Sequence, residues 1–186
     1  MKYLVVGLGN IGSEYELTRH NIGFLVLDRL AEMKKVPFEP ARYGDLAVIK
    51  HKGRTIHLVK PSTYMNLSGK AVNYWLTQLK IPKEQLLVIV DDIAIPFGNL
   101  RMRPKGSDAG HNGMKSVEQL TGGNNYPRLR FGIGSDFHSG QQVDYVLSRF
   151  KQEEFDALPP LMDKAIEMIF SFCSIGINRT MNQFNN

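Results

Sequence analysis

The residue best suited to chemistry in this chain is His20, which lies in the run Thr18–Gly23 (TRHNIG). The run follows a glycine-rich segment and precedes an apolar stretch with helical spacing, which predicts a polar turn. An imidazole in such a turn titrates near neutral pH and can accept or donate a proton. We interpret His20 as the best candidate for a general base.

The other histidines are weaker candidates. His111 precedes Asn112 in a glycine-rich loop and is a rival to His20. His51 and His57 belong to a predicted hairpin, and His138 belongs to a loop that we expect to be exposed.

A partner for His20 is available in Asp91, which follows the apolar run 86–90. Its carboxylate could accept a hydrogen bond from one ring nitrogen, fixing the tautomer and leaving the other nitrogen free for a proton. Asp91 could instead form a turn after the strand. The pair Asp91 and Asp92 could also bind Mg²⁺, although successive strand residues point to opposite faces.

Three loop asparagines, Asn10, Asn66 and Asn112, could bind substrate. An amide offers a donor and an acceptor without charge, which suits a peptide backbone or a carbonyl that becomes negative during attack. As alternatives, Asn112 could cap a helix at Met114, and Asn66 could cap a helix at Ala71.

The sequence offers no obvious covalent nucleophile. There is no Gly-x-Ser-x-Gly elbow, and the single cysteine, Cys173, lies in an apolar run. No Cys/His grouping has zinc spacing, so we predict no metal. A base with amide donors suits direct attack by water on an ester, for example one with a ribose leaving group on a polyanion.

Basic residues alternate along two short segments. Arg101, Arg103 and Lys105 alternate in one, and Arg128 and Arg130 in the other, within a chain of net charge +5. On a strand, alternation places each set on one face, which predicts a basic stripe suited to phosphates. A solvated sheet face explains the charges equally well.

The pattern of elements predicts an α/β fold: a single domain, residues 1–186, with a twisted mixed β-sheet and helices on both faces. No apolar run is long enough to span a membrane, and the N-terminus is interpreted as the first core strand of a cytosolic protein rather than a signal peptide. Ligands in such folds sit at the carboxyl ends of strands, where Asn10 and Asp91 could be neighbours. The expected strands are 2–7, 45–49, 55–60, 85–90, 100–103 and 129–134, and the expected helices are 22–33, 70–79, 113–120, 141–150 and 151–176.

The segment Gly7–Gly12 matches the dinucleotide pattern Gly-x-Gly-x-x-Gly after a strand. A dinucleotide fingerprint runs directly into a helix, whereas residues 13–21 are polar and the predicted helix begins afterwards. The acid required about 20 residues further on would be Asp28, which lies inside that helix. We therefore reject an oxidoreductase and expect a tight turn that places Asn10 at the sheet edge.

The chain resembles the bacterial peptidyl-tRNA hydrolase family over nearly its whole length. The ordered set of matching motifs comprises Gly7–Asn10, Tyr15 with Thr18–Gly23, Met65–Gly69, Asp91–Asp92 and Gly106–Gly113.

The resemblance implies a role for each matching residue. It makes His20 the base that activates water, Asp91 the residue that holds His20 in its basic form, and Asn10 the residue that separates N-blocked peptidyl-tRNA from free aminoacyl-tRNA. The positions that match those binding the peptide and the terminal nucleotide are Tyr15, Tyr64, Asn66 and Asn112. Arg101 and Arg130 match basic positions that grip acceptor-stem phosphates, and the stripe adds Arg103 and Lys105.

The resemblance also implies a cytoplasmic monomer without a cofactor or an obligatory protein partner, whose substrate is peptidyl-tRNA and whose role is to recycle tRNA. Ala109 and Ala94 depart from the family pattern, which often has glycine and aspartate there. We expect the Ala109 methyl group to narrow its loop slightly and the change at Ala94 to leave Asp91 unaffected. The alternative hypothesis is a catalytically silent RNA-binding relative of the same fold.

Overall fold

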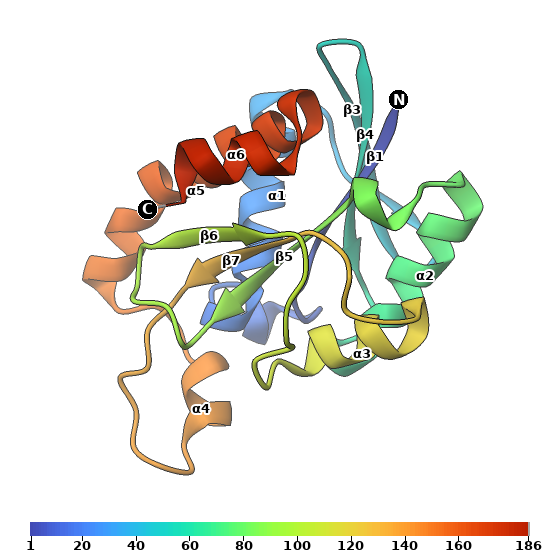
Figure 1. The fold of residues 1–186 in the computed structure, drawn as a ribbon. Helices are drawn as coiled ribbons and strands as arrows, with labels where there is room; N and C mark the ends of the chain where they lie inside the picture. The colour runs from blue at the N-terminus through green and yellow to red at the C-terminus, as the bar shows by residue number, and fades with distance from the viewer. Residues whose placement is uncertain (186) are drawn as a thin grey trace.

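A seven-stranded mixed sheet forms the centre of the protein in our computed structural model, which describes residues 1–185 (Figure 1). The strand order is β2-β3-β4-β1-β5-β7-β6. The strands are β1 (Lys2–Gly7), β2 (Glu39–Ala41), β3 (Gly44–His51), β4 (Arg54–Pro61), β5 (Leu86–Asp92), β6 (Leu100–Arg103) and β7 (Arg128–Gly132).

The centre of the sheet is parallel and both of its edges are antiparallel. β4, β1, β5 and β7 run parallel to one another, whereas β2, β3 and β6 pair antiparallel to their neighbours. The β3–β4 hairpin was predicted from sequence. The short strand β2 was not, because its three exposed residues include Pro40 and carry no apolar alternation.

Helices cover both faces of the sheet (Figure 1). α1 (Ile22–Met33), α5 (Gln152–Ile175) and α6 (Ile177–Phe184) lie on one face, and α2 (Ser68–Leu79) and α3 (Asn112–Thr121) lie on the other. Short 3₁₀ turns occur at η1 (Ser13–Tyr15), η2 (Arg19–Asn21), η3 (Met65–Leu67) and η4 (Lys83–Gln85). The predicted fold class, one α/β domain with a mixed sheet and helices on both faces, is confirmed.

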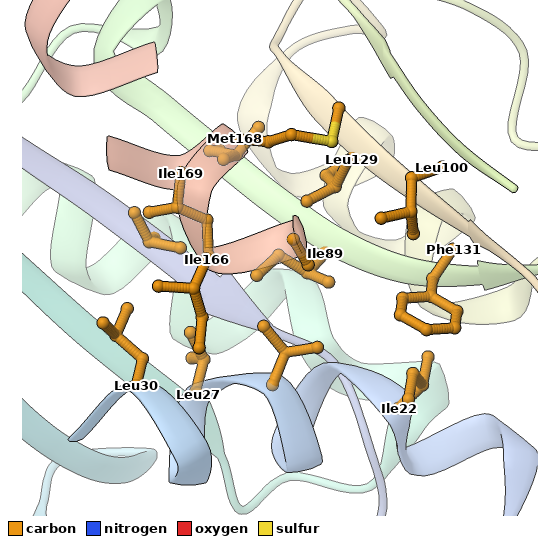
Figure 2. Close-up of a cluster of buried hydrophobic side chains, with 14 of the residues drawn as sticks. Ile22, Leu27, Leu30, Ile89, Leu100, Leu129, Phe131, Ile166, Met168 and Ile169 are labelled. Carbon is orange, nitrogen blue, oxygen red and sulfur yellow. The ribbon is translucent and has the colours of Figure 1, made fainter. Parts of the chain in front are cut away.

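The core follows from strand alternation in β5, the central strand. Leu87 and Ile89 face the α1–α5 side, while Val88 and Val90 face the α2–α3 side, and all four are fully buried. Figure 2 shows side chains of α1 and α5 meeting those of β5, β6 and β7 on the first side. Burial on both faces fixes the direction in which each residue at the end of β5 points.

The predicted helix 141–150 is wrong in extent, since only α4 (Gln142–Val146) is helical. The chain leaves the helix because Arg149 forms a β-bridge with Thr18, and the Ser148 carbonyl accepts a hydrogen bond from the Arg19 N–H. The prediction for 151–176 holds as α5, but the chain then turns at Gly176 and forms α6, which the sequence analysis missed.

The glycine pattern near the N-terminus is explained by packing. A Cβ atom at Gly7 would lie 2.2 Å from the Gly23 carbonyl oxygen, and one at Gly9 would lie 2.8 Å from the Phe24 ring. These glycines let α1 cross closely over β1, and α1 begins only at Ile22, after η1 and η2. The structure thus agrees with rejection of a dinucleotide fingerprint.

Within residues 1–185, no helix is both long and apolar enough to cross a lipid bilayer.

Candidate active site

The candidate site lies at the carboxyl ends of neighbouring parallel strands β1 and β5. Asn10 follows β1, Asp91 is the penultimate residue of β5, and His20 is carried by η2 directly before α1. The expected proximity of Asn10, His20 and Asp91 is therefore found. The close crossing of α1 over β1 brings η2, and with it His20, to this edge of the sheet.

His20 and His111 share one carboxylate. His20 Nδ1 lies 3.0 Å from Oδ1 and 2.9 Å from Oδ2 of Asp91, and His111 Nε2 lies 3.0 Å from Oδ1. Asp91 is only 5% exposed. From the sequence, His111 is a rival of His20, whereas in the structure it is a second partner of Asp91.

Hydrogen bonding around His111 fixes its tautomer. Its Nδ1 accepts the backbone N–H groups of Gly113 and Met114 at the start of α3, so its proton is on Nε2 and points at Asp91. Since Asp91 is an acceptor, His20 likewise donates from Nδ1. The lone pair of neutral His20 is then on Nε2, away from the carboxylate.

The charges of the cluster shift the pKa values of His20 and Asp91 in the directions that favour their ionised forms. Burial lowers the pKa of His20, but the Asp91 carboxylate outweighs burial and leaves that pKa above its ordinary value of 6.5. Burial would raise the pKa of Asp91, but His20 and His111 hold it well below its usual range. Asp91 is therefore ionised at neutral pH, and its negative charge favours the protonated form of His20.

His20, Asp91 and His111 are close enough to hold a metal ion, with one candidate ligand atom from each within 4.8 Å of the others. The tautomer of His111 opposes this. If its Nε2 bound a metal, the ring proton would move to Nδ1 and face the two backbone N–H donors of α3. The arrangement is better suited to holding protons than to holding a cation.

Asn10 is held by hydrogen bonds on three sides. Its side-chain Oδ1 accepts the Met65 N–H at 2.7 Å, and its backbone exchanges two hydrogen bonds with the Asn21 side chain. Within residues 1–185, its Nδ2 group has no hydrogen-bond partner. The side chain therefore presents a fixed amide donor.

Two adjoining hollows meet at His20. The first, of about 60 Å³, extends from His20 past Asp91 and His111 to Arg130. The second, of about 240 Å³, extends from His20 to Asn10, and Asn66 and Asn112 line it. Val143 and Val146 of α4 line both hollows. No motif in the sequence indicated that these two valines would line the site.

The alternative capping roles of Asn66 and Asn112 are excluded. Asn112 does not cap α3, because the His111 side chain does, and the N-cap of α2 is Leu67 rather than Asn66. Both asparagines are left exposed at the second hollow. Tyr15 and Tyr64 line neither hollow, and Tyr64 is 52% exposed on the flank beside Met65.

The four arginines of β6 and β7 share one face of the outer strands, as alternation predicted, whereas Lys105 of the predicted stripe lies beyond β6. Arg101 pairs in register with Arg130, and Arg103 with Arg128. They differ in availability. Arg101 is exposed, Arg103 is half-buried and Lys105 is exposed in the loop after β6.

The two arginines of β7 have internal partners. Arg128 is fully buried and donates to the carbonyls of Tyr126, Gly106 and Asn124, so it is a structural residue. Arg130 lies 3.3 Å from an Asp92 carboxylate oxygen and donates to the Ser107 carbonyl at 2.7 Å. Asp92 thus contacts Arg130, while Asp91 contacts the histidines.

Ala109 lies in the left-handed backbone region, with φ of 53°. A residue with a Cβ atom costs roughly 1–2 kcal/mol more than glycine there. Ala109 also lines the first hollow. Ala94 donates its N–H to Asp92 and has no contact with the bonds that hold Asp91.

Burial also bears on Cys173. It is fully buried in the core, and burial raises the pKa of its thiol to about 12. Cys173 is therefore a core residue, as predicted, and not a nucleophile.

Fold and site together define an α/β protein with a histidine–carboxylate pair in a cleft at the carboxyl edge of its sheet, an arrangement suited to a hydrolytic enzyme. The family model described as peptidyl-tRNA hydrolase matches residues 4–186. The chain belongs to the peptidyl-tRNA hydrolase family.

Individual relatives agree with this assignment. The chain is 57% identical over 185 residues to the peptidyl-tRNA hydrolase of Porphyromonas gingivalis, and 58% identical over 186 residues to that of Parabacteroides distasonis, with 100% of each chain covered. A crystal structure of peptidyl-tRNA hydrolase from Acinetobacter baumannii superposes with a TM-score of 0.92 at 31% identity, covering 98% of this chain and 94% of that one. The predicted family and enzyme class are confirmed.

Proposed function

We propose that this protein hydrolyses the ester bond between peptide and tRNA in prematurely released peptidyl-tRNA, and so recycles tRNA. The observation that carries the proposal is the free Nε2 lone pair of His20, fixed by the Asp91 hydrogen bond in a cleft with amide donors.

In the proposed reaction, His20 Nε2 takes a proton from water, whose oxygen attacks the ester carbonyl carbon. The carbon–oxygen bond to the terminal ribose then breaks, and the proton passes from His20 to the ribose oxygen. Peptide carboxylic acid and free tRNA hydroxyl are the products, and the acid ionises at neutral pH. Asp91 stabilises the transient imidazolium. No serine, threonine or cysteine is found among the described residues that line the two hollows, which favours attack by water.

Asn66 and Asn112 are proposed to bind the peptide carbonyls and the terminal nucleotide, because their amides are exposed in the second hollow. We propose that Tyr15 and Tyr64 contribute at the periphery. Their positions outside both hollows limit them to contacts with parts of the substrate that lie beyond the ester.

Asn10 is proposed to select N-blocked substrates. Because Met65 occupies its Oδ1, the Nδ2 donor faces the cleft and can donate to a peptide carbonyl. A free aminoacyl-tRNA presents an ammonium group instead, and two donors facing each other bind poorly. Peptidyl-tRNA is therefore favoured over aminoacyl-tRNA.

The tRNA is proposed to approach along the face of β6 and β7 that carries Arg101, Arg103, Arg128 and Arg130. We call this surface the arginine face. Arg101, Arg103 and Lys105 have room for phosphates, whereas Arg130 shares its charge with Asp92 at the cleft wall. We further propose a cytoplasmic monomer, as in the implied family role. Light scattering should give the mass of one 21.0 kDa chain.

The test is incubation with N-acetyl-aminoacyl-tRNA and with its unblocked counterpart. We expect tRNA release from the blocked substrate alone. RNA binding without release from either substrate would instead support the silent relative.

A further inference from the structure

We propose that the peptide of the substrate continues past Asn10 into a third hollow, and that this hollow prefers basic over acidic peptide residues. The inference rests on the proposed function. The hollow has a volume of about 550 Å³ and lies between η1, α1 and the β3–β4 hairpin. Its lining includes Asn10, Ser13, Glu16, Phe24, Asp45 and Lys60.

The third hollow shares a lining residue with the cleft. Asn10 borders both the second and the third hollow, so the two meet at the residue proposed to contact the first peptide carbonyl. The Met65 N–H donates to the Oδ1 atom of Asn10, so the Asn10 side chain cannot rotate freely and block the passage between the two hollows. A chain that passes the Asn10 amide enters the third hollow next.

The order of the strands gives the substrate a direction. Across the sheet, Arg101 lies on β6, Arg130 on β7 and Asp91 on β5. On the other side of β1 lie Lys60 of β4 and Asp45 of β3, which pair in register near the same edge. With tRNA at the arginine face and the ester at His20, the peptide is directed toward β4 and β3.

The chemistry of the hollow fits a peptide of mixed composition. Phe24, Leu25 and Leu17 supply apolar surface. Lys60 is neutralised by its ion pair with Asp28, whereas Glu16 and Asp45 take part in no ion pair within residues 1–185. The lining therefore carries unneutralised negative charge, which attracts lysine or arginine side chains and repels glutamate or aspartate.

The first test compares substrates that differ in length. Kinetics are measured for N-acetyl-aminoacyl-tRNA and for an N-acetyl-tetrapeptidyl-tRNA with the same tRNA and the same esterified residue. We expect the longer substrate to have the higher kcat/KM in the wild type. Ser13→Trp, which fills the hollow from the exposed turn η1, should reduce the long-to-short ratio to about one. Thermal unfolding of the variant verifies that it is folded.

The second test varies charge without altering shape. Tetrapeptidyl substrates with two lysines or two glutamates at their N-terminal end should differ in KM by roughly two- to fivefold, the size of a solvent-exposed charge interaction. Asp45→Asn should reduce this preference. Glu39→Gln, an exposed acid on β2 outside the hollow, is the matched control and should retain it.

The outcomes separate the two proposals. Hydrolysis of the blocked substrates with no effect of length, or a length effect that Ser13→Trp leaves intact, would overturn the peptide path and leave the proposed function standing. An unchanged charge preference in Asp45→Asn would overturn the basic selectivity. If neither blocked substrate is hydrolysed, the proposed function and the peptide path both fail.

Discussion

The cleft around His20 and the arginine face differ in how their polar groups are bound. In the cleft, Asp91 binds two histidines, His111 binds the start of α3 and Asn10 binds Met65. On the arginine face, the side chains of Arg101 on β6 and Lys105 in the loop after β6 have no hydrogen bond or ion pair within residues 1–185, and both residues are exposed. The cleft holds individual atoms in fixed positions, as the proposed reaction requires, whereas the arginine face leaves charged side chains free, as the proposed phosphate contacts require.

The arginines of this face also differ from one another in burial. Arg128 and Arg101 lie on the same face of paired strands, but Arg128 is buried under its carbonyl partners and Arg101 is exposed. Position on a face therefore does not decide whether a charge can bind a ligand. Coverage by the neighbouring loop decides it.

The largest effect is expected from His20→Ala. Loss of a general base typically lowers turnover by about 10²–10⁴-fold. Single-turnover cleavage of N-acetyl-aminoacyl-tRNA should fall by that factor, while filter binding of the substrate is retained. His138→Ala, which removes a histidine from an exposed loop, is the control and should keep near-normal turnover. Near-normal turnover in His20→Ala would remove His20 as the base.

A large effect on stability is expected from Arg128→Met, which leaves three carbonyls without their buried donor. At about 1 kcal/mol or more for each, the loss is roughly 3 kcal/mol. For a chain of this length, Tm should fall by roughly 6–12 °C in a thermal melt. Arg101→Met should leave Tm nearly unchanged, and equal effects of the two variants would contradict the distinction between them.

A smaller effect, on selectivity, is expected from Asn10→Asp. The new carboxylate still accepts the Met65 N–H, but an acceptor replaces the Nδ2 donor. The ratio of kcat/KM for blocked over unblocked aminoacyl-tRNA should fall by roughly 10- to 100-fold, the worth of a charged hydrogen bond. If that ratio is unaltered, a residue other than Asn10 distinguishes the N-blocked substrate from the free amine.

The smallest effect is expected from Arg101→Met on tRNA binding. Loss of one phosphate contact should lower the slope of log K against log salt by about 1. Binding measured between 50 and 200 mM salt, roughly the range in which phosphate contacts dominate, gives that slope. A slope equal to that of the wild type would exclude Arg101 from the tRNA interface.

The fold could be predicted well from the sequence because strands and helices are indicated by patterns of neighbouring residues. Apolar runs such as 86–90 form strands, and helical spacing after Asn21 forms α1. The sequence also predicted that Asn10 and Asp91 could be neighbours, because parallel strands end at one edge, and it paired His20 with Asp91 by hydrogen-bond chemistry. Apart from that pairing, these predictions need only periodicity and strand direction.

What sequence missed depends on contacts between distant segments. The second hydrogen bond to Asp91 requires the His111 ring to be held by the backbone at the start of α3. The only sign of this in the sequence is the run GHNG (110–113) before a predicted helix. Alternation assigned Arg128 to a face, but burial under the loop that contains Gly106 is tertiary. The end of α4 is set by Arg19 and Thr18, far away in the chain.

The most direct test of the central claim is the pH dependence of kcat/KM for N-acetyl-aminoacyl-tRNA in the wild type and in Asp91→Asn. In the proposed mechanism neutral His20 is the active form, and Asp91 raises its pKa above 6.5, so the wild-type rate should fall as pH drops through that raised pKa. In Asp91→Asn the burial of His20 remains and the negative charge is lost, so the acidic limb should move below pH 6.5 while the maximal rate also falls. An acidic limb at the same pH in both proteins, or none in the wild type, would contradict a base at His20 held by Asp91.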